Sequence, residues 1–309
     1  MKISANGLSE MTLGTVQLGL RYGIANTLGK PDRGTACQMI QEAIRMGVNS
    51  LDTAQSYGDS EEVIGDCLRQ YPGMRDGLAV TSKLVVQTPD GAPDNDFQRE
   101  ITGKAAESLK RLGIGQLRFF LLHQAADMYK SGGAVARAME KLVASGAAAG
   151  AGVSVYTEKD IREMLRYPVF TAVQLPLSVF DQKLIDSGIL PELERRGITV
   201  FVRSVFSQGL LFMEPERMTK PVLAEYMLPH LLQLRARCRE IGCTPSDYAL
   251  SFIRRLPGVT SLVLGAESRE QVQEDAAMFG RPPMGDPEYE TARRLFAKVP
   301  FDRIMEALR

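Results

Sequence analysis

Short apolar runs recur along the chain, and the segments between them carry apolar residues at helical spacing. Each run is bounded by turn residues, which is typical of βα units around a parallel sheet. Several runs are apolar on both faces, as expected of strands buried between a packed interior and a layer of helices. We therefore predict eight strands, at 11–18, 48–54, 78–84, 117–124, 149–156, 172–179, 198–206 and 260–266.

The intervening stretches predict eight helices, at 36–46, 61–70, 97–112, 135–145, 158–166, 187–196, 246–255 and 268–278. Thr35 and Thr157 stand immediately before two of them, where a hydroxyl side chain commonly caps a helix. A further helix at 228–241 and a C-terminal stretch after the proline-rich segment 282–287 lie outside the repeat.

Eight strands, each followed by a helix, predict an α/β fold of the (β/α)₈ TIM-barrel type, because an open doubly wound sheet usually has fewer strands. The 309 residues, 44% of them hydrophobic, suffice for one large core. We find no low-complexity linker and no domain boundary, and expect residues 1–309 to form a single domain.

The charge balance excludes some partners. Lys+Arg and Asp+Glu number 37 each, so there is no excess positive charge to attract nucleic acid or an anionic membrane surface. No apolar run approaches the roughly 20 residues that cross a bilayer, and the opening residues lack the order of a secretion signal. We expect a soluble, cytoplasmic protein that is a monomer or a small homo-oligomer. Its four cysteines form no CxxC motif, so we expect reduced thiols.

Candidate chemistry lies at the ends of the second, third and fourth predicted strands. In a barrel of this type the catalytic groups stand at the carboxyl ends of several strands, which share one rim. The segments LDTAQSYG, TSK and LLHQ place four chemically useful side chains there, namely Asp52, Tyr57, Lys83 and His123.

These four residues, in this order and on these strands, resemble the catalytic tetrad of the aldo-keto reductase superfamily. The resemblance extends from the first strand to the last βα unit. It implies an enzyme that moves a hydride between NAD(P)(H) and a carbonyl or alcohol carbon. It further implies Tyr57 as the proton donor, with Lys83 and Asp52 as its activators. His123 would orient the substrate carbonyl.

The chemistry explains why these residue types occur together. An isolated phenol, with a pKa of about 10, is a poor acid at neutral pH, and a neighbouring ammonium favours its ionisation. Lys83 can supply that charge, and a carboxylate at Asp52 would keep a half-buried ammonium protonated. The imidazole of His123 can donate a hydrogen bond to a carbonyl oxygen and fix its direction.

Other interpretations stay open. Taken singly, Tyr57 is an ordinary half-buried aromatic residue, and Lys83 with Asp52 a structural ion pair. A nicotinamide-nucleotide-binding regulatory subunit with little turnover would carry the same four residues, although the chain shows no long extension for a partner. A barrel hydrolase or isomerase could use Asp52 and His123 with a metal. The chain has two histidines and no HxH motif, so we expect no metal site.

The resemblance also implies a dinucleotide site in the second half of the chain. Ser154 and Gln174 match residues that hydrogen-bond the nicotinamide carboxamide, segment 203–211 matches a loop along the pyrophosphate, and segment 264–275 matches an adenosine-binding turn and helix. Arg203 departs from the family pattern, because many relatives place an aromatic residue there. The expected cofactor-binding residues are Gly14, Thr15, Val16, Asp52, Ser154, Gln174, Arg203, Ser204, Val205, Phe206, Gly209, Gly265, Ala266, Glu267, Gln271, Glu274 and Asp275.

The choice between NAD(H) and NADP(H) depends on one position. Relatives that prefer NADP(H) commonly carry Arg or Lys where this chain has Glu267, whose carboxylate would repel a 2′-phosphate but could accept hydrogen bonds from a free ribose hydroxyl. This favours NAD(H). The family's general preference for NADP(H), and Arg269 at the start of the next helix, favour the opposite.

The substrate is expected to be a small carbonyl compound or alcohol. The chain has no Trp and few aromatic residues, which suits a polar, sugar-like or polyol-derived molecule better than a steroid. The loops at 20–31 and 178–183, with the segment after the fourth strand, are expected to shape its site. The expected substrate-contacting residues are Arg21, Tyr22, Tyr57, His123 and Phe180. The physiological substrate and the reaction direction remain open.

Overall fold

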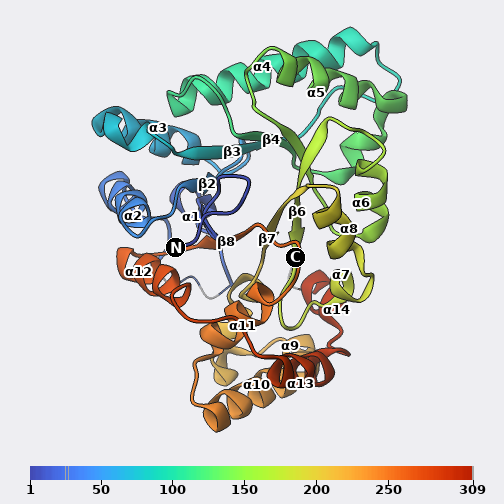
Figure 1. The fold of residues 1–309 in the computed structure, drawn as a ribbon. Coiled ribbons are helices and arrows are strands. Elements are labelled where there is room, and N and C mark those ends of the chain that lie inside the picture. Colours follow the sequence, from blue (N-terminus) through green and yellow to red (C-terminus); the bar gives the residue numbers. More distant parts are fainter. Residues whose placement is uncertain (25, 27, 308–309) are drawn as a thin grey trace.

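Eight parallel strands close into a barrel in chain order, with β8 hydrogen-bonded to β1 (Figure 1). The computed structural model describes residues 1–24, 26 and 28–307. The strands are β1 (Met11–Gly14), β2 (Ser50–Asp52), β3 (Ala79–Leu84), β4 (Phe119–Leu122), β5 (Ala151–Ser154), β6 (Phe170–Pro176), β7 (Thr199–Arg203) and β8 (Ser261–Gly265). The predicted (β/α)₈ barrel is confirmed.

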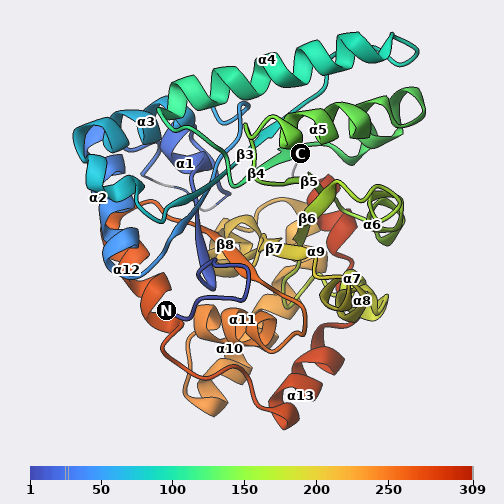
Figure 2. The same cartoon turned by 45° about the horizontal axis from the view of Figure 1, so that its top comes forward.

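Helices surround the strands on the outside of the barrel (Figure 2). The eight that follow the strands are α2 (Arg33–Arg45), α3 (Ser60–Gln70), α4 (Asp94–Leu112), α5 (Ala134–Ala144), α6 (Glu158–Met164), α8 (Ile189–Arg195), α11 (Pro245–Arg254) and α12 (Arg269–Met278). Two single-turn helices were not predicted. α1 (Val16–Gly19) lies where the first strand was expected to continue to residue 18, so that prediction is wrong at its end, and α7 (Lys183–Asp186) lies in the loop after β6. In the part of the chain described, no helix is long and apolar enough to cross a membrane.

Helix starts follow the capping side chains. Thr157 accepts a hydrogen bond from the Asp160 amide at 3.2 Å, which confirms it as the N-cap of α6. The prediction for Thr35 is wrong. Asp32 caps α2 by accepting from the Thr35 amide at 2.9 Å, so the helix begins three residues earlier than its apolar periodicity indicated.

The barrel has an apolar interior separate from its outer core. Phe119, Leu121, Ala172 and Phe201 point inward and form one cluster with Leu8. Leu8 comes from the N-terminal segment, in which Ile3 and Ser9 form an antiparallel bridge. Strand residues of the opposite parity point outward. Among them, Leu51, Leu122, Val173 and Val202 belong to the larger core between strands and helices.

The same alternation directs the polar residues at the carboxyl ends of the strands. Side chains two residues apart on a strand lie on the same face. The position after Leu121 in the inward series is therefore His123, the one after Ala172 is Gln174, and the one after Phe201 is Arg203. The barrel thus changes from an apolar interior to a polar rim within one strand period.

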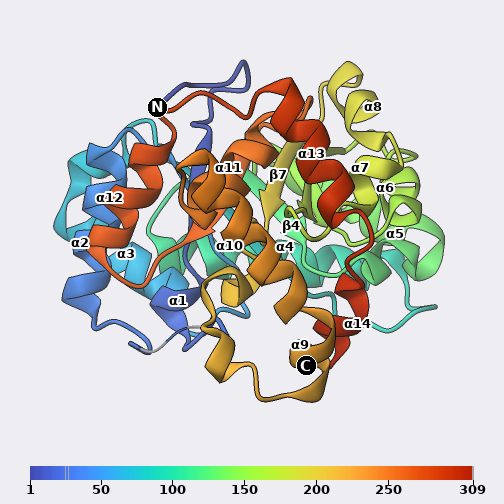
Figure 3. The same cartoon turned by 90° about the horizontal axis from the view of Figure 1, so that it is seen from below.

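Four more helices cover one side of the barrel, as seen in Figure 3. They are α9 (Pro221–Tyr226), α10 (Leu228–Ile241), α13 (Asp286–Phe296) and α14 (Phe301–Glu306). The predicted helix at 228–241 is confirmed as α10. Glu288 on α13 joins three helices, because it accepts from Tyr248 of α11 at 2.6 Å and from Arg237 of α10 at 3.0 Å.

Cys37 on α2 and Cys67 on α3 form a disulfide, with 5.3 Å between their Cα atoms. The expectation that all four thiols are reduced is therefore wrong for this pair. The two residues are 30 positions apart and belong to no motif. They meet because α2 and α3 are adjacent on the barrel, which a spacing rule does not reveal. Cys238 and Cys243 are free thiols.

Candidate active site

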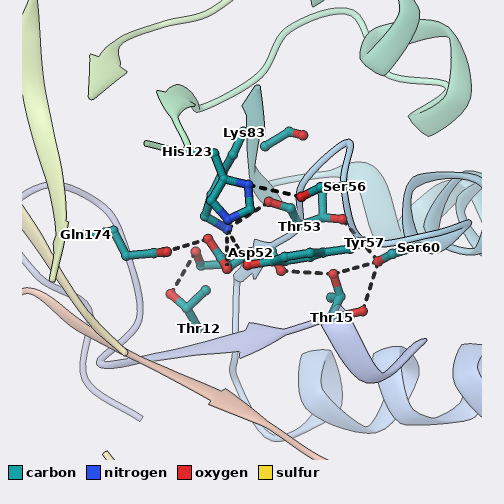
Figure 4. A network of polar contacts seen from close by, with 12 residues as sticks. Thr12, Thr15, Asp52, Thr53, Ser56, Tyr57, Ser60, Lys83, His123 and Gln174 are labelled. Atoms are coloured by element: carbon teal, nitrogen blue, oxygen red, sulfur yellow. Dashed lines mark hydrogen bonds and ion pairs between the residues drawn. The ribbon is translucent and has the colours of Figure 1, made fainter. Parts of the chain in front are cut away.

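Four polar side chains from three neighbouring strand ends meet at the rim of the barrel (Figure 4). Lys83 Nζ donates to Asp52 Oδ2 at 2.7 Å, to the Thr53 carbonyl at 2.9 Å and to the Tyr57 hydroxyl at 3.3 Å. Asp52 ends β2, Tyr57 lies in the loop before α3, and Lys83 lies near the end of β3. The predicted proximity of Asp52, Tyr57 and Lys83 is thus present in the structure.

The Lys83 ammonium is fully buried, and its neighbours keep it charged. Burial acts to lower its pKa, but the charge of Asp52 and the hydrogen bonds to Asp52 and Tyr57 outweigh burial, and the pKa of Lys83 lies above its ordinary value. Lys83 is therefore protonated at neutral pH. Its nitrogen also lies 4.8 Å from the centroid of the Tyr57 ring, so the cation faces both the ring and its hydroxyl.

Gln174 supports the ion pair from the opposite side of the barrel. Its amide nitrogen donates to Asp52 Oδ1 at 2.7 Å, so both carboxylate oxygens of Asp52 have a partner. A buried carboxylate is stable only when paired and hydrogen-bonded in this way. Gln174 was expected to contact a nicotinamide carboxamide. It lines the cavity, but its amide N–H group orients Asp52.

His123 follows β4 directly, and its ring lies edge-on to the ring of Tyr57, with 5.6 Å between the centroids. Burial, together with the charge of Lys83 and a smaller contribution from Arg203, lowers the pKa of His123 to about 4. The imidazole is therefore neutral at pH 7. Its Nδ1 lies 3.0 Å from the Ser56 hydroxyl. When that hydroxyl donates to Nδ1, the ring carries its proton on Nε2.

Asp52, Tyr57 and His123 line a cavity of about 290 Å³ at the carboxyl ends of the strands, whereas Lys83 is buried and does not line it. Of the residues predicted for the site, those that line it are Gly14, Thr15, Val16, Tyr22, Asp52, Tyr57, His123, Ser154, Gln174, Arg203, Ser204, Val205, Phe206, Gly209, Gly265, Glu267 and Gln271. Such a cavity, with convergent polar groups at the carboxyl rim of a barrel, has the form of a small-molecule site.

The loop after β7 contributes an unusual backbone to this cavity. Ser204, Ser207 and Gln208 have φ angles of 62°, 52° and 57°, and Gly209 has 93°. Non-glycine residues rarely adopt this left-handed region. The N–H groups of Ser207 and Gly209 are already hydrogen-bonded, to the carbonyls of Ser204 and Phe206 at 2.8 and 3.0 Å. Turns that combine right- and left-handed residues can present their other N–H groups to an anion such as a pyrophosphate.

A comparison with known families adds the decisive observation. The model of the family described as "Aldo/keto reductase family" matches residues 10–295. The chain belongs to the aldo/keto reductase family. Members of this family are oxidoreductases, so the predicted resemblance is confirmed.

Several relatives of this reductase match along most of its length. It is 28% identical to the NADH-specific methylglyoxal reductase of Escherichia coli (strain K12) over 303 residues, 87% of this chain and 89% of the relative. The holo form of an aldo-keto reductase from Bacillus halodurans superposes with a TM-score of 0.76 at 22% identity, covering 93% of this chain and 92% of the other. A glycerol dehydrogenase from Gluconobacter oxydans gives 0.76 at 23%, covering 95% and 93%. Both structures bear on the fold alone.

The segment after β8 holds Glu267 and Arg269, the residues on which the expected choice of cofactor depends. Glu267 lines the cavity, and its backbone N–H donates to Gln271 Oε1 at 2.9 Å. Arg269, the cation next along the chain, is engaged elsewhere. Its Nε donates to Glu42 Oε2 of α2 at 3.0 Å, and Glu42 is also hydrogen-bonded by Arg45.

Three other expected cofactor residues do not line the cavity. Ala266 is buried behind it, and Glu274 is exposed on α12. Asp275 is buried on the same helix, with no hydrogen-bond partner for Oδ2 among the described residues. Burial, with a contribution from Glu274, raises the pKa of Asp275 to about 8. This carboxyl is therefore mostly uncharged at pH 7.

Some of the residues expected to contact the substrate line the cavity and others do not. Tyr22 lines the cavity, whereas Arg21 is exposed outside it. Positions 25 and 27 of this loop lie outside the described residues. The prediction that Phe180 contacts the substrate is wrong. Phe180 is buried in the core against Phe296, with 5.3 Å between the ring centroids, because the loop after β6 turns inward beneath α13.

Sequence reasoning missed other residues that line the cavity, including Gln17, Asn26, Tyr156, Gln208 and Phe212. Tyr156 lies two residues beyond β5, and its place just after a strand end could have identified it. Phe212 and Asn26 come from loops that reach the cavity only after folding. The Ile24 amide donates to the Gln208 carbonyl at 3.0 Å, which joins those two loops.

Proposed function

We propose that this reductase transfers a hydride between NAD(H) and the carbonyl carbon of a small polar substrate. The observation that supports the proposal most is the position of Lys83 Nζ, which contacts both Asp52 and the Tyr57 hydroxyl at the wall of the cavity. A buried ammonium beside a phenol hydroxyl has a direct use in proton transfer.

Tyr57 is the proton donor in this proposal. As its hydroxyl gives a proton to the carbonyl oxygen, negative charge develops on the phenol oxygen, and the Lys83 ammonium 3.3 Å away stabilises that charge. Asp52, held by Gln174, keeps the ammonium protonated. In the reverse direction the ionised phenol accepts the proton of the alcohol, so the same groups serve both directions.

His123 orients the substrate oxygen. A neutral imidazole with its proton on Nε2 can donate a hydrogen bond to the carbonyl oxygen without competing with Tyr57 as the acid. Burial and the charge of Lys83 maintain this neutral state, because both lower the pKa of His123, to about 4. The edge-on contact between His123 and Tyr57 brings the orienting group and the proton donor to one point of the cavity.

The cavity wall suits a dinucleotide. When bound, the nicotinamide supplies or accepts the hydride. Ser154 would hold its carboxamide, the loop at 204–209 its pyrophosphate, and segment 265–271 its adenosine. Two observations support this fit: the left-handed backbone at Ser204, Gln208 and Gly209, and the buried Oε1 atom of Gln17, which has no hydrogen-bond partner among the described residues.

NAD(H) fits the adenosine end better than NADP(H). Glu267 would repel a 2′-phosphate, and the nearby cation, Arg269, is held by Glu42. Moving Arg269 to the phosphate would leave the carboxylate of Glu42, which is buried, with one partner fewer. The bacterial relative described as NADH-specific supports the same choice.

The proposal is tested by turnover with each reduced cofactor. Purified protein is mixed with NADH or NADPH and a panel of sugar aldehydes, keto-polyols and aromatic aldehydes, and loss of the reduced-nicotinamide absorbance is followed. We expect turnover with NADH and a polar aldehyde or ketone. Binding of NADH without oxidation by any carbonyl compound would contradict the enzyme assignment and favour a regulatory role.

A further inference from the structure

Arg203 is a cavity-lining cation that the proposed mechanism does not use. It is the last residue of β7, and its inward position places it at the same rim as His123. Its guanidinium carbon lies 4.4 Å from the centroid of the Tyr156 ring, so the group is stacked on an aromatic face. Nη1 lies 3.5 Å from the Ser204 hydroxyl, the outer limit of a hydrogen bond.

Among the described residues, the guanidinium of Arg203 has no anionic partner. Its Nη2 atom is buried and has no hydrogen-bond partner within the described ranges 1–24, 26 and 28–307. In the same part of the chain no carboxylate forms an ion pair with Arg203, and the nearby tetrad carboxylate, Asp52, is engaged by Lys83 and Gln174. Leaving a buried charged donor unpaired is costly, and an anion that arrives with a ligand would remove that cost.

The charge of Arg203 acts at the place where the substrate carbonyl would lie. It contributes to the lowered pKa of His123, after burial and Lys83, and it opposes the rise that burial and Tyr57 cause in the pKa of Tyr22. His123 and Tyr22 both line the cavity. The unpaired guanidinium is therefore close to the proton-transfer groups and is not an isolated feature of the barrel rim.

We infer that Arg203 binds an anionic group of the substrate, so that the substrates of this site are carbonyl compounds that also carry a carboxylate or a phosphate. The planar guanidinium presents a fork of N–H groups that matches both anions, and stacking on Tyr156 fixes its plane. The inference rests on the proposed function, because it assigns the substrate class of the same site. It narrows the proposed substrate class from polar carbonyl compounds to anionic carbonyl compounds.

The kinetic test compares matched substrates that differ in one anionic group. One pair is 4-oxobutanoate and its methyl ester, and the other is glyceraldehyde 3-phosphate and glyceraldehyde. Wild type is expected to have the higher kcat/KM for the anionic member of at least one pair, and which pair does so tells carboxylate from phosphate. Arg203→Met should reduce this anionic-to-neutral ratio roughly tenfold or more, and Arg203→Lys should retain part of it.

An effect of Arg203 on the cofactor alone would lower the rates for both members of a pair equally. An unchanged ratio in Arg203→Met, or a wild-type ratio of one or less in both pairs, overturns the inference while leaving carbonyl reduction intact.

A binding test separates this inference from the proposed function. Butanoate and inorganic phosphate cannot be reduced here, and ligand-observed NMR detects their binding without turnover, with butanol as the neutral control. We expect one of the anions to bind to wild type and to lose binding in Arg203→Met. If an anion binds in this Arg203-dependent way but no carbonyl compound oxidises NADH, the anion site is upheld and the proposed reductase activity is contradicted. Absence of Arg203-dependent binding of both anions would overturn the inference.

Discussion

Lys83 has three oxygen partners within 3.3 Å, and two of them lie on Asp52 and Tyr57. Asp52 keeps the ammonium charged, and that charge stabilises the phenol oxygen of Tyr57 when it loses its proton. Removing the ammonium would affect both the ion pair and the acid. Replacing the phenol oxygen would leave the ion pair intact, which makes Tyr57 the cleaner position for a test.

Tyr57→Phe is expected to lower kcat by roughly a hundredfold or more, because the transferable proton is lost and the ring is kept. NADH binding should remain, since the Lys83–Asp52 pair and the loop after β7 are untouched. Steady-state kinetics and a fluorescence titration of NADH measure the two effects. A variant that keeps most of its kcat would show that Tyr57 is not the proton donor.

His123 is expected to stay neutral well below the ordinary pH range of histidine. Its pKa of about 4 means that proton NMR of the imidazole should show no protonation between pH 7 and about pH 5. The chain has only two histidines, so His230→Gln leaves a single signal to follow. Titration of that signal near pH 6.5 would contradict the buried, neutral ring.

At the residue scale, the sequence predicted which side chains lie at the rim better than it predicted the contacts between them. Strand ends identified Asp52, Lys83 and His123, because position on a parallel strand determines which rim a side chain reaches. The hydrogen bond from Gln174 to Asp52 crosses the barrel between residues 122 positions apart, and no local pattern indicates it. Phe180 was misplaced for a similar reason, since its environment depends on α13, more than a hundred residues later.

At the scale of elements, the loops after β7 and β8 set the shape of the cofactor side. Apolar periodicity predicted the strands before these loops and the helix after β8, because both repeat regularly. It could not predict the left-handed turns at Ser204, Ser207 and Gln208, which tertiary contacts impose on non-glycine residues. Strand bounds were predicted too long for the same reason: β7 stops at Arg203, where the chain leaves the sheet for the cavity.

The start of the β8 loop carries a prediction on cofactor choice. Wild type should bind NADH at least as tightly as NADPH, and Glu267→Arg should reverse the ratio. A charge contact near the surface is worth roughly 1 kcal/mol, so we expect a several-fold change. Fluorescence titration of both reduced cofactors measures it. A strong wild-type preference for NADPH that survives removal of Glu267 would contradict the assignment of this segment to adenosine.

At the scale of the whole molecule, the barrel separates stability from chemistry along its axis. The apolar cluster that contains Leu8, Phe119 and Phe201 fills one part of the interior, and the polar rim lies at the carboxyl ends of the same strands. Closure of the sheet follows from eight regular βα units and was predictable. The contribution of the N-terminal segment was not, because Leu8 lies before the first repeat.

Leu8→Ala should lower the free energy of unfolding by about 2–5 kcal/mol, because it leaves a cavity in a fully buried cluster. Exposed Leu232 on α10 is the matched control, and its replacement by Ala should change stability by about 0.5 kcal/mol or less. Urea unfolding measures both. Equal effects of the two substitutions would show that Leu8 does not support the barrel interior.

The central claim, hydride transfer to a carbonyl carbon, is tested most directly by isotope transfer. Wild type is incubated with NADH deuterated at the transferable position of C4 and a carbonyl compound identified by the turnover screen, and the product is analysed by mass spectrometry. The account predicts an alcohol with one deuterium on the former carbonyl carbon, formed roughly a hundredfold or more slowly by Tyr57→Phe under conditions where that variant binds NADH. An alcohol that contains no deuterium, whichever of the two C4 hydrogens of NADH is replaced by deuterium, would contradict the account. Absence of any alcohol product would contradict it too.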